Sequence, residues 1–105
     1  MVIVELSIIP LGVGTSISKF LAPALKELEK WGVKYEITPM CTIFEAENIN
    51  EALRIAGAMH EAVFKADVKR VVTSIRIDDR RDKKRGMEEK VKSLKSKLER
   101  ADMPK

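Results

Sequence analysis

The order in which strand-like and helix-like patterns follow one another constrains this chain more than any single motif. Residues 2–9 are almost continuously apolar and β-branched, and only Glu5 and Ser7 interrupt them. Because these two residues stand two apart, they share one face of a strand, and the opposite face is fully apolar. The first element is therefore predicted to be a strand with one core face and one mixed face.

Six further patterns follow this strand. A helix is expected at about residues 17–31, because its apolar side chains recur at helical spacing, and Gly32 supplies a C-terminal stop. Two closely spaced strand-like runs then form a hairpin, and a second helix begins after Asn48 or Asn50 and ends near Ala66. The remaining expected ranges are residues 34–38, 41–46 and 70–78 for strands and about 87–101 for a final helix.

This order, βαββαβ with one more helix, is the pattern of the ferredoxin-like sandwich, in which two helices pack on one face of a four-stranded antiparallel sheet. The chain has 105 residues, of which 45% are hydrophobic, and this is room for one core. We therefore predict an α+β protein with a single ferredoxin-like domain over residues 1–105. Within it, residues 79–105 form a basic loop and a C-terminal helix.

The second face of the predicted sheet starts uncovered. We expect on it an apolar patch that monomers rarely tolerate, formed by Ile3, Ile9, Phe44 and Val72. Glu5 and Arg76 fall on the same face, on strands that are neighbours in this topology, and can pair across it. Association of two copies covers such a face. A final helix that folds back over the sheet is the alternative.

The final helix offers a second apolar surface. Its apolar residues recur at steps of four and three, which is typical of a narrow coiled-coil seam, at Met87, Val91, Leu94, Leu98 and Ala101. Two apolar surfaces predict two interfaces, and hence a homotetramer built as a dimer of dimers.

Basic residues gather at the C-terminal end. The formal net charge is +4, and residues 79–105 alone carry 11 Lys and Arg against six Asp and Glu. A nucleic-acid binder usually adds exposed aromatic side chains, but all five aromatic residues lie outside this segment. We therefore expect a solvated helix face and no nucleic-acid partner.

The sequence also indicates a compartment. No apolar run approaches the roughly 20 residues of a membrane-spanning helix, and the first residues lack the basic segment and cleavage site of a signal peptide. The one cysteine, Cys41, can form neither an internal disulfide nor a thiolate zinc site. We expect a soluble protein of the reducing cytoplasm with no membrane partner.

No catalytic or metal signature stands out, so no cofactor and no metal are expected. Three isolated residues each allow two interpretations. His60 is either satisfied by a hydrogen bond within the core or part of a ligand site, and Cys41 is a small core residue rather than a nucleophile. Glu45 shares a strand face with apolar neighbours, so its carboxylate either reaches water or serves a partner that offers donors or positive charge.

Four parts of the chain, taken in order, carry a family resemblance. They are residues 7–16 (SIIPLGVGTS), residues 39–45 (PMCTIFE), His60 and residues 76–80 (RIDDR). Together they resemble the small proteins called thiamine-binding-protein-like. The resemblance implies the ferredoxin-like fold, pairing through the sheets and tetramers of two dimers. It also implies a ligand, thiamine or its hydroxymethylpyrimidine portion, that is bound without chemical conversion.

The resemblance also assigns residues. The family's recurring Ser, Pro, Thr-x-x-Glu and helix His fall on Ser7, Pro10, Thr42, Glu45 and His60. Cys41 and Ala46 stand where glycine is expected, which narrows a pocket there. An aminopyrimidine presents an amino donor beside ring-nitrogen acceptors, and a carboxylate with a hydroxyl matches that edge. A thiazolium cation favours a carboxylate or an aromatic face such as that of Phe44.

We therefore expect a non-enzymatic cytoplasmic binding protein for thiamine or a related aminopyrimidine such as hydroxymethylpyrimidine. The expected ligand-binding residues are Ser7, Thr42, Phe44, Glu45 and His60. The main alternative is a structural or regulatory homo-oligomer that acts through a protein partner. A nucleic-acid binder that uses the basic tail and a small enzyme are further alternatives.

Overall fold

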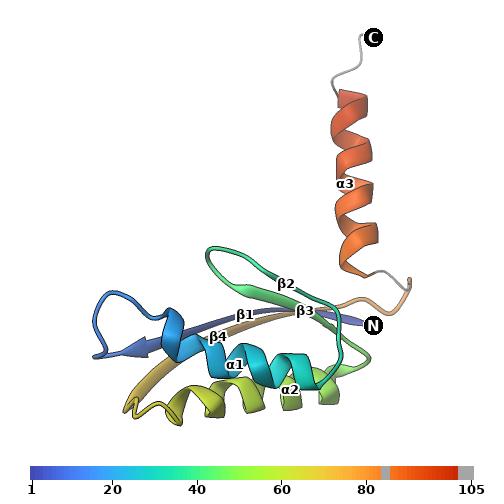
Figure 1. Cartoon of the computed structure of the whole chain (residues 1–105). Helices are drawn as coiled ribbons and strands as arrows, with labels where there is room; N and C mark the ends of the chain where they lie inside the picture. Colours follow the sequence, from blue (N-terminus) through green and yellow to red (C-terminus); the bar gives the residue numbers. More distant parts are fainter. Residues whose placement is uncertain (84–85, 102–105) are drawn as a thin grey trace.

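The computed structural model describes residues 1–83 and 86–101 and contains the expected order of elements (Figure 1). The strands and helices are β1 Val2–Leu11, α1 Ser18–Lys30, β2 Tyr35–Ile37, β3 Thr42–Ala46, α2 Ile49–Phe64, β4 Arg70–Asp79 and α3 Met87–Ala101. Both long strands run slightly further than their sequence patterns indicated, because β1 and β4 pair with each other from end to end. Helix α2 begins after Asn48, whose side-chain oxygen accepts the N–H of Glu51 at 2.9 Å.

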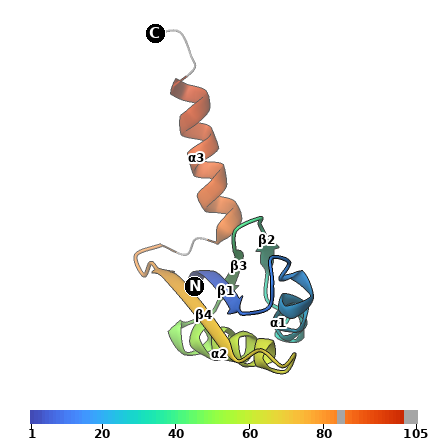
Figure 2. The same cartoon turned by 90° about the vertical axis from the view of Figure 1, so that its left-hand side faces the viewer.

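The strands form one antiparallel sheet in the order β2-β3-β1-β4, and α1 and α2 lie side by side on one of its faces (Figures 1 and 2). Alternate side chains of β1 are buried beneath the helices, as the apolar face of the first strand predicted. These side chains are Val2, Val4, Leu6 and Ile8, and they belong to one core with Leu28 of α1 and Ile55, Met59 and Val63 of α2. The fold is the predicted α+β ferredoxin-like sandwich with an additional C-terminal helix.

Phe44 belongs to this core, and its expected place on the open face was wrong. Its side chain is fully buried, and its residue pairs with Val4 in β1 and with Tyr35 in β2. Paired residues of adjacent strands point to the same face, and Val4 points to the helices. Because side chains alternate along a strand, placing Ile43 and Glu45 on the open face leaves Phe44 for the core.

Among residues 1–83 and 86–101, no element packs across the open face of the sheet, and only the start of α3 borders it near Ile3. Glu5 lies directly opposite Arg76 in the register, as expected. Two apolar side chains of this face, Ile9 and Val72, are exposed. Helix α3 begins near one end of the sheet and then stands away from the sandwich (Figures 1 and 2). The alternative in which the final helix folds back over the sheet is therefore not the arrangement of this structure.

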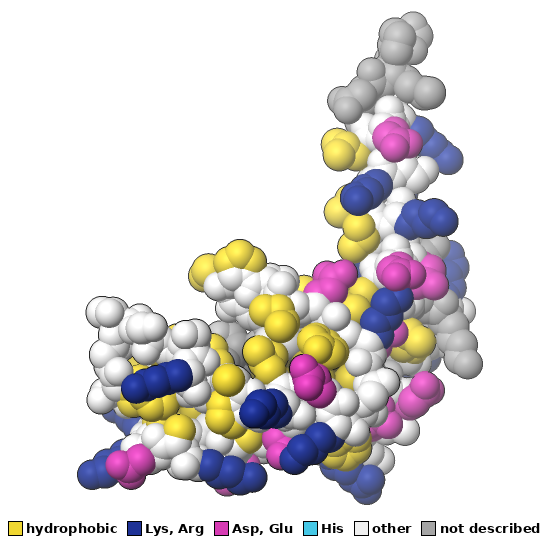
Figure 3. All heavy atoms as spheres, in the orientation of Figure 1, with side chains coloured by type: hydrophobic (Ala, Val, Ile, Leu, Met, Phe, Trp, Pro, Cys, Tyr) yellow, Lys and Arg dark blue, Asp and Glu magenta, His cyan; other side chains and the backbone are white. Residues whose placement is uncertain are grey.

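Helix α3 exposes the predicted apolar stripe. Met87 at its start is buried, but Val91, Leu94 and Leu98 are 49%, 69% and 62% exposed. Figure 3 shows apolar side chains along one side of this helix and basic ones beside them. The basic side chains Lys92, Lys95, Lys97 and Arg100 are exposed, as expected for a solvated face. No helix in the described ranges is long and apolar enough to cross a membrane.

Candidate functional site

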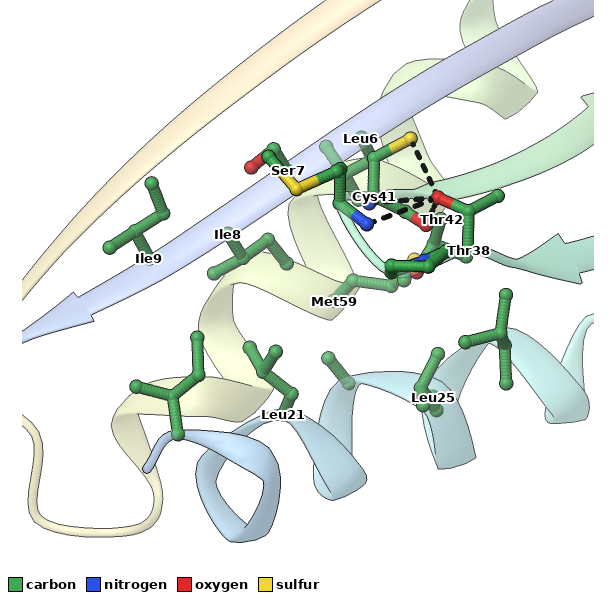
Figure 4. A pocket seen from close by; sticks show the side chains of 15 residues that line it. Leu6, Ser7, Ile8, Ile9, Leu21, Leu25, Thr38, Cys41, Thr42 and Met59 are labelled. Atoms are coloured by element: carbon green, nitrogen blue, oxygen red, sulfur yellow. Dashed lines mark hydrogen bonds between the residues drawn. The ribbon is translucent and has the colours of Figure 1, made fainter. Parts of the chain in front are cut away.

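A cleft lies beside the part of β1 that extends beyond its pairing with β3. Strand β1 pairs with β4 along its whole length but with β3 only from Val2 to Leu6, whose partner is Thr42. Within the described part of the chain, residues 7–11 therefore have no strand beside them on the side of β3. Helix α1 and residues 38–41, which join β2 to β3, border the space that is left (Figure 4).

The cleft has a volume of about 370 Å³ and largely apolar walls. Its size falls within the range of roughly 300 to 1,000 Å³ that is usual for small-molecule sites. Apolar side chains from β1 and the helices point toward one another across it, among them Ile8, Leu21, Leu25 and Met59 (Figure 4). Uncharged polar side chains lie at one end, and no lining residue in the described ranges is charged. Such a lining suits a small, largely apolar molecule.

The β2–β3 turn forms a lip of the cleft, and the hydroxyl of Thr38 holds it in place. Thr38 Oγ1 accepts the N–H of Cys41 at 3.0 Å and that of Met40 at 3.3 Å, and it donates to the Cys41 carbonyl at 2.8 Å. The same oxygen lies 3.4 Å from Cys41 Sγ. The thiol is thus part of the turn's hydrogen bonding.

Two of the five predicted ligand residues reach this cleft. Thr42 lies on its wall, half-buried, on the face of β3 that looks toward the helices. Ser7 lies at its rim, on the open face of β1, opposite Ser74 of β4. Ser7 of β1 and Thr42 of β3 therefore both border the cleft, although their side chains lie on opposite faces of the sheet.

Glu45 lies away from the cleft, at the end of the sheet where α3 begins. Its Oε1 accepts the N–H of Met87 at 2.7 Å, so the carboxylate caps the start of α3. A side chain at Gly86 would require that carboxylate to move, because a Cβ there would overlap Glu45 Oε1. The structure shows no separate partner at Glu45 within the described residues: the donor that its carboxylate accepts is the main-chain N–H at the start of a helix of the same chain.

Ion pairs reinforce the attachment of α3. Lys34 Nζ lies 2.6 Å from Glu88 Oε1, and Lys90 pairs with Asp78. The bond between Lys34 and Glu88 raises the pKa of the Lys34 ammonium and lowers the pKa of the Glu88 carboxyl. Because these side chains are exposed, each pair adds little stability in salt. The neighbouring hollow on the open face mixes charges of both signs, from Glu5, Arg76, Asp78, Asp79 and Lys90.

The last two predicted site residues lie away from the cleft, Phe44 fully buried in the core and His60 half-buried on α2. His60 Nδ1 is 2.6 Å from the hydroxyl oxygen of Thr73, and its ring meets Phe64 edge-on at 5.4 Å between centroids. This is the hydrogen-bonded interpretation of His60, and neither His60 nor Phe44 lines the cleft. No cluster of His, Cys, Asp and Glu suited to a metal ion occurs within residues 1–83 and 86–101.

Sequence reasoning missed the apolar wall and the lip of the cleft. Leu21 and Leu25 fall within the helix expected at about residues 17–31 but were not predicted as site residues, and of residues 38–41 only Cys41 was connected with a pocket. The sequence contains one signal that the first strand has an open edge. The first strand pattern is longer than the third, and Pro39 lies in the connection that precedes the third. An unequal pair of neighbouring strands leaves one edge open.

Comparison with known proteins confirms the family resemblance. The sequence profile of the family described as Thiamine-binding protein matches residues 4–95. A UPF0045 protein of Methanothermobacter thermautotrophicus is 46% identical over 99 residues, which cover 93% of this chain and all of the relative. The UPF0045 protein YqgV of Bacillus subtilis is 41% identical over 104 residues, with coverage of 94% and 99%.

Solved structures agree with the fold. A hypothetical protein of Methanocaldococcus jannaschii superposes with a TM-score of 0.81 at 40% identity, over 89% of this chain and 94% of the other. A Thermotoga maritima protein, whose given name proposes a role in thiamine biosynthesis or salvage, superposes with a TM-score of 0.73 at 25% identity, over 89% and 97%. The similarity in each case extends over most of both chains.

Proposed function

The chain belongs to the thiamine-binding protein family, and on this premise we propose that it binds thiamine or a related aminopyrimidine, such as hydroxymethylpyrimidine, without converting it. The observation that carries the proposal is the cleft beside the open edge of β1. Its volume of about 370 Å³ accommodates a substituted pyrimidine, and its walls offer apolar surface with hydroxyl groups at one end.

The lining supports binding rather than catalysis. Hydrolysis or group transfer needs an activated nucleophile or an acid and a base within reach of each other. Among the described lining residues there is no Asp, Glu, His, Lys or Arg, and the Cys41 thiol interacts with Thr38. We therefore propose that the protein is not an enzyme, and that it resides in the cytoplasm, where Cys41 stays reduced.

Calorimetric titration with hydroxymethylpyrimidine and with thiamine tests the proposal. We expect saturable binding of at least one of them, and Thr42→Val weakens it roughly three- to tenfold, because one neutral hydrogen bond is lost while the shape is kept. Ser7→Ala lowers the affinity to a smaller extent, since Ser7 lies at the rim. Ser74→Ala is the matched control, because Ser74 pairs with Ser7 in the register but lies outside the cleft.

The absence of heat with both ligands would refute small-molecule binding of this class. The alternative of a regulatory oligomer that acts through a protein partner would then be favoured. Equal affinity in the parent and in Thr42→Val, with binding otherwise intact, would place the ligand outside the cleft.

The two exposed apolar surfaces support a second proposal, a homotetramer. The open sheet face offers Ile9 and Val72, and α3 offers Val91, Leu94 and Leu98. Surfaces on different elements that point in different directions provide two separate two-fold contacts, and two such contacts generate a dimer of dimers.

A further inference from the structure

The hydrogen bonds between β2 and β3 fix the direction of every main-chain group in β3. The N–H of Glu45 donates to the Lys34 carbonyl at 3.0 Å, and the N–H of Thr38 donates to the Cys41 carbonyl at 2.9 Å. In an antiparallel sheet the main-chain groups of successive residues point to opposite sides. The odd-numbered residues of β3 therefore face β2. The even-numbered ones, Thr42, Phe44 and Ala46, face β1.

The register between β3 and β1 shows which residues of β1 have main-chain groups that point toward β3. The partners of those three residues are Leu6, Val4 and Val2, so their N–H and C=O groups point toward β3. The next residues with the same direction are Ile8 and Pro10, where β3 has already ended. The N–H and the C=O of Ile8 therefore face the cleft, although its side chain belongs to the core.

Pro10 limits what can occupy this edge. An open strand edge normally invites another strand. Pro10 lacks an N–H on the side where an added strand would need a donor, and proline is tolerated in a strand at such a position. The edge therefore offers one donor, that of Ile8, beside carbonyl acceptors. This short pattern fits a small molecule better than an extended peptide.

We propose that the main chain of Ile8 recognises the ligand through a ring edge that carries an amino group next to a ring nitrogen. The amino group donates to the Ile8 carbonyl, and the ring nitrogen accepts the Ile8 N–H, as in a hydrogen-bonded pair of an antiparallel sheet. The ring then lies against the apolar side chains of α1, such as Leu21 and Leu25. This inference rests on the proposed function and names the feature of the ligand that the cleft selects.

Ligand analogues test whether the cleft selects a ring edge that carries an amino group next to a ring nitrogen. Hydroxymethylpyrimidine has this edge, and its analogue with hydrogen in place of the amino group lacks the donor. We expect the analogue to bind at least about fivefold more weakly, because the Ile8 carbonyl is left without a partner. Cytosine carries the same edge on a different ring. Tighter binding of cytosine than of hydroxymethylpyrimidine would support the recognition by Ile8 and contradict the thiamine class of ligand.

Amide hydrogen exchange of the parent protein, followed by NMR, tests whether the Ile8 N–H is the group that binds the ligand. With saturating hydroxymethylpyrimidine, we expect exchange of the Ile8 amide to slow at least tenfold and its resonance to shift. The Ile9 amide is the internal control, because the alternation directs it to β4. Hydroxymethylpyrimidine that binds while the Ile8 amide stays unchanged would overturn this inference and leave the proposed function standing. No binding at all would overturn both.

Discussion

The two ends of the sheet have opposite chemistry. At one end β1 and β4 continue past β3, and the space beside them is lined by apolar and uncharged side chains. At the other end α3 is attached by a carboxylate cap and by ion pairs, and the hollow at its base mixes charges of both signs. The uncharged end offers largely apolar walls with hydroxyl groups at one side. The charged end is where α3 begins, with its first N–H bonded to Glu45.

Thr42 and Glu45 show how this division arises from sequence. They lie three residues apart on one strand, and an odd separation places two side chains on opposite faces. Thr42 therefore looks toward the helices and the cleft, whereas Glu45 looks toward α3. Two residues of one motif thus serve different ends of the molecule.

The largest effect is expected for the surface of α3. Replacing Leu94 and Leu98 with Glu places charge on the apolar stripe, so the proposed tetramer should fall from four chains to two, which halves the mass seen by light scattering after size exclusion. Because both side chains are mostly exposed, the sandwich core should remain folded. Ligand binding in the cleft should persist.

The control for this experiment is Ser96→Glu. Ser96 lies on the same helix, two residues from each leucine, and therefore on the side of α3 away from the stripe. This variant should keep the parent mass. If the double variant keeps the parent mass as well, the stripe of α3 is not an interface.

A smaller effect, confined to one end, is expected for Glu45→Ala. Loss of the cap leaves the Met87 N–H without its acceptor and weakens the attachment of α3 by about 1 kcal/mol or more. Amide exchange in the first turn of α3 should become faster. The affinity for hydroxymethylpyrimidine should stay within about twofold of the parent, because Glu45 does not line the cleft.

Glu47→Ala is the matched control, since Glu47 is an exposed neighbour whose carboxylate caps nothing in the described structure. A loss of ligand affinity in Glu45→Ala, with α3 unaffected, would indicate that Glu45 contacts the ligand. The division between the two ends of the sheet would then be wrong.

The fold could be predicted from the sequence because it depends on periodicity. Alternation in β1 and β4 and helical spacing in α1 and α2 are local signals, and their order leaves few topologies. The cap on α3 could not be found in the same way. It joins Glu45 to Met87 across 42 positions and depends on the path of the intervening chain.

The site was predictable only in part. Ser7 and Thr42 came from the family resemblance, and both reach the cleft. The role proposed for Ile8 depends on its main chain, and side-chain motifs carry no signal for a main-chain group. It became visible only once the register showed where β3 ends.

The smallest effect is expected for the ion pair between Lys34 and Glu88. The bond lowers the pKa of the Glu88 carboxyl, so its contribution to the attachment of α3 is present above the ordinary pKa and is lost as the pH falls through the lowered pKa. In Lys34→Gln the pKa of Glu88 should rise toward that of an ordinary glutamate carboxyl. NMR titration measures it. An unchanged pKa would mean that the pair does not form in solution.

A crystal structure of the protein with hydroxymethylpyrimidine tests the central claim most directly. The account predicts ligand density in the cleft between the edge of β1 and α1, within hydrogen-bond distance of the Ile8 main chain and close to Thr42. Density on the open sheet face or at the base of α3, with the cleft empty at saturating ligand, would contradict it.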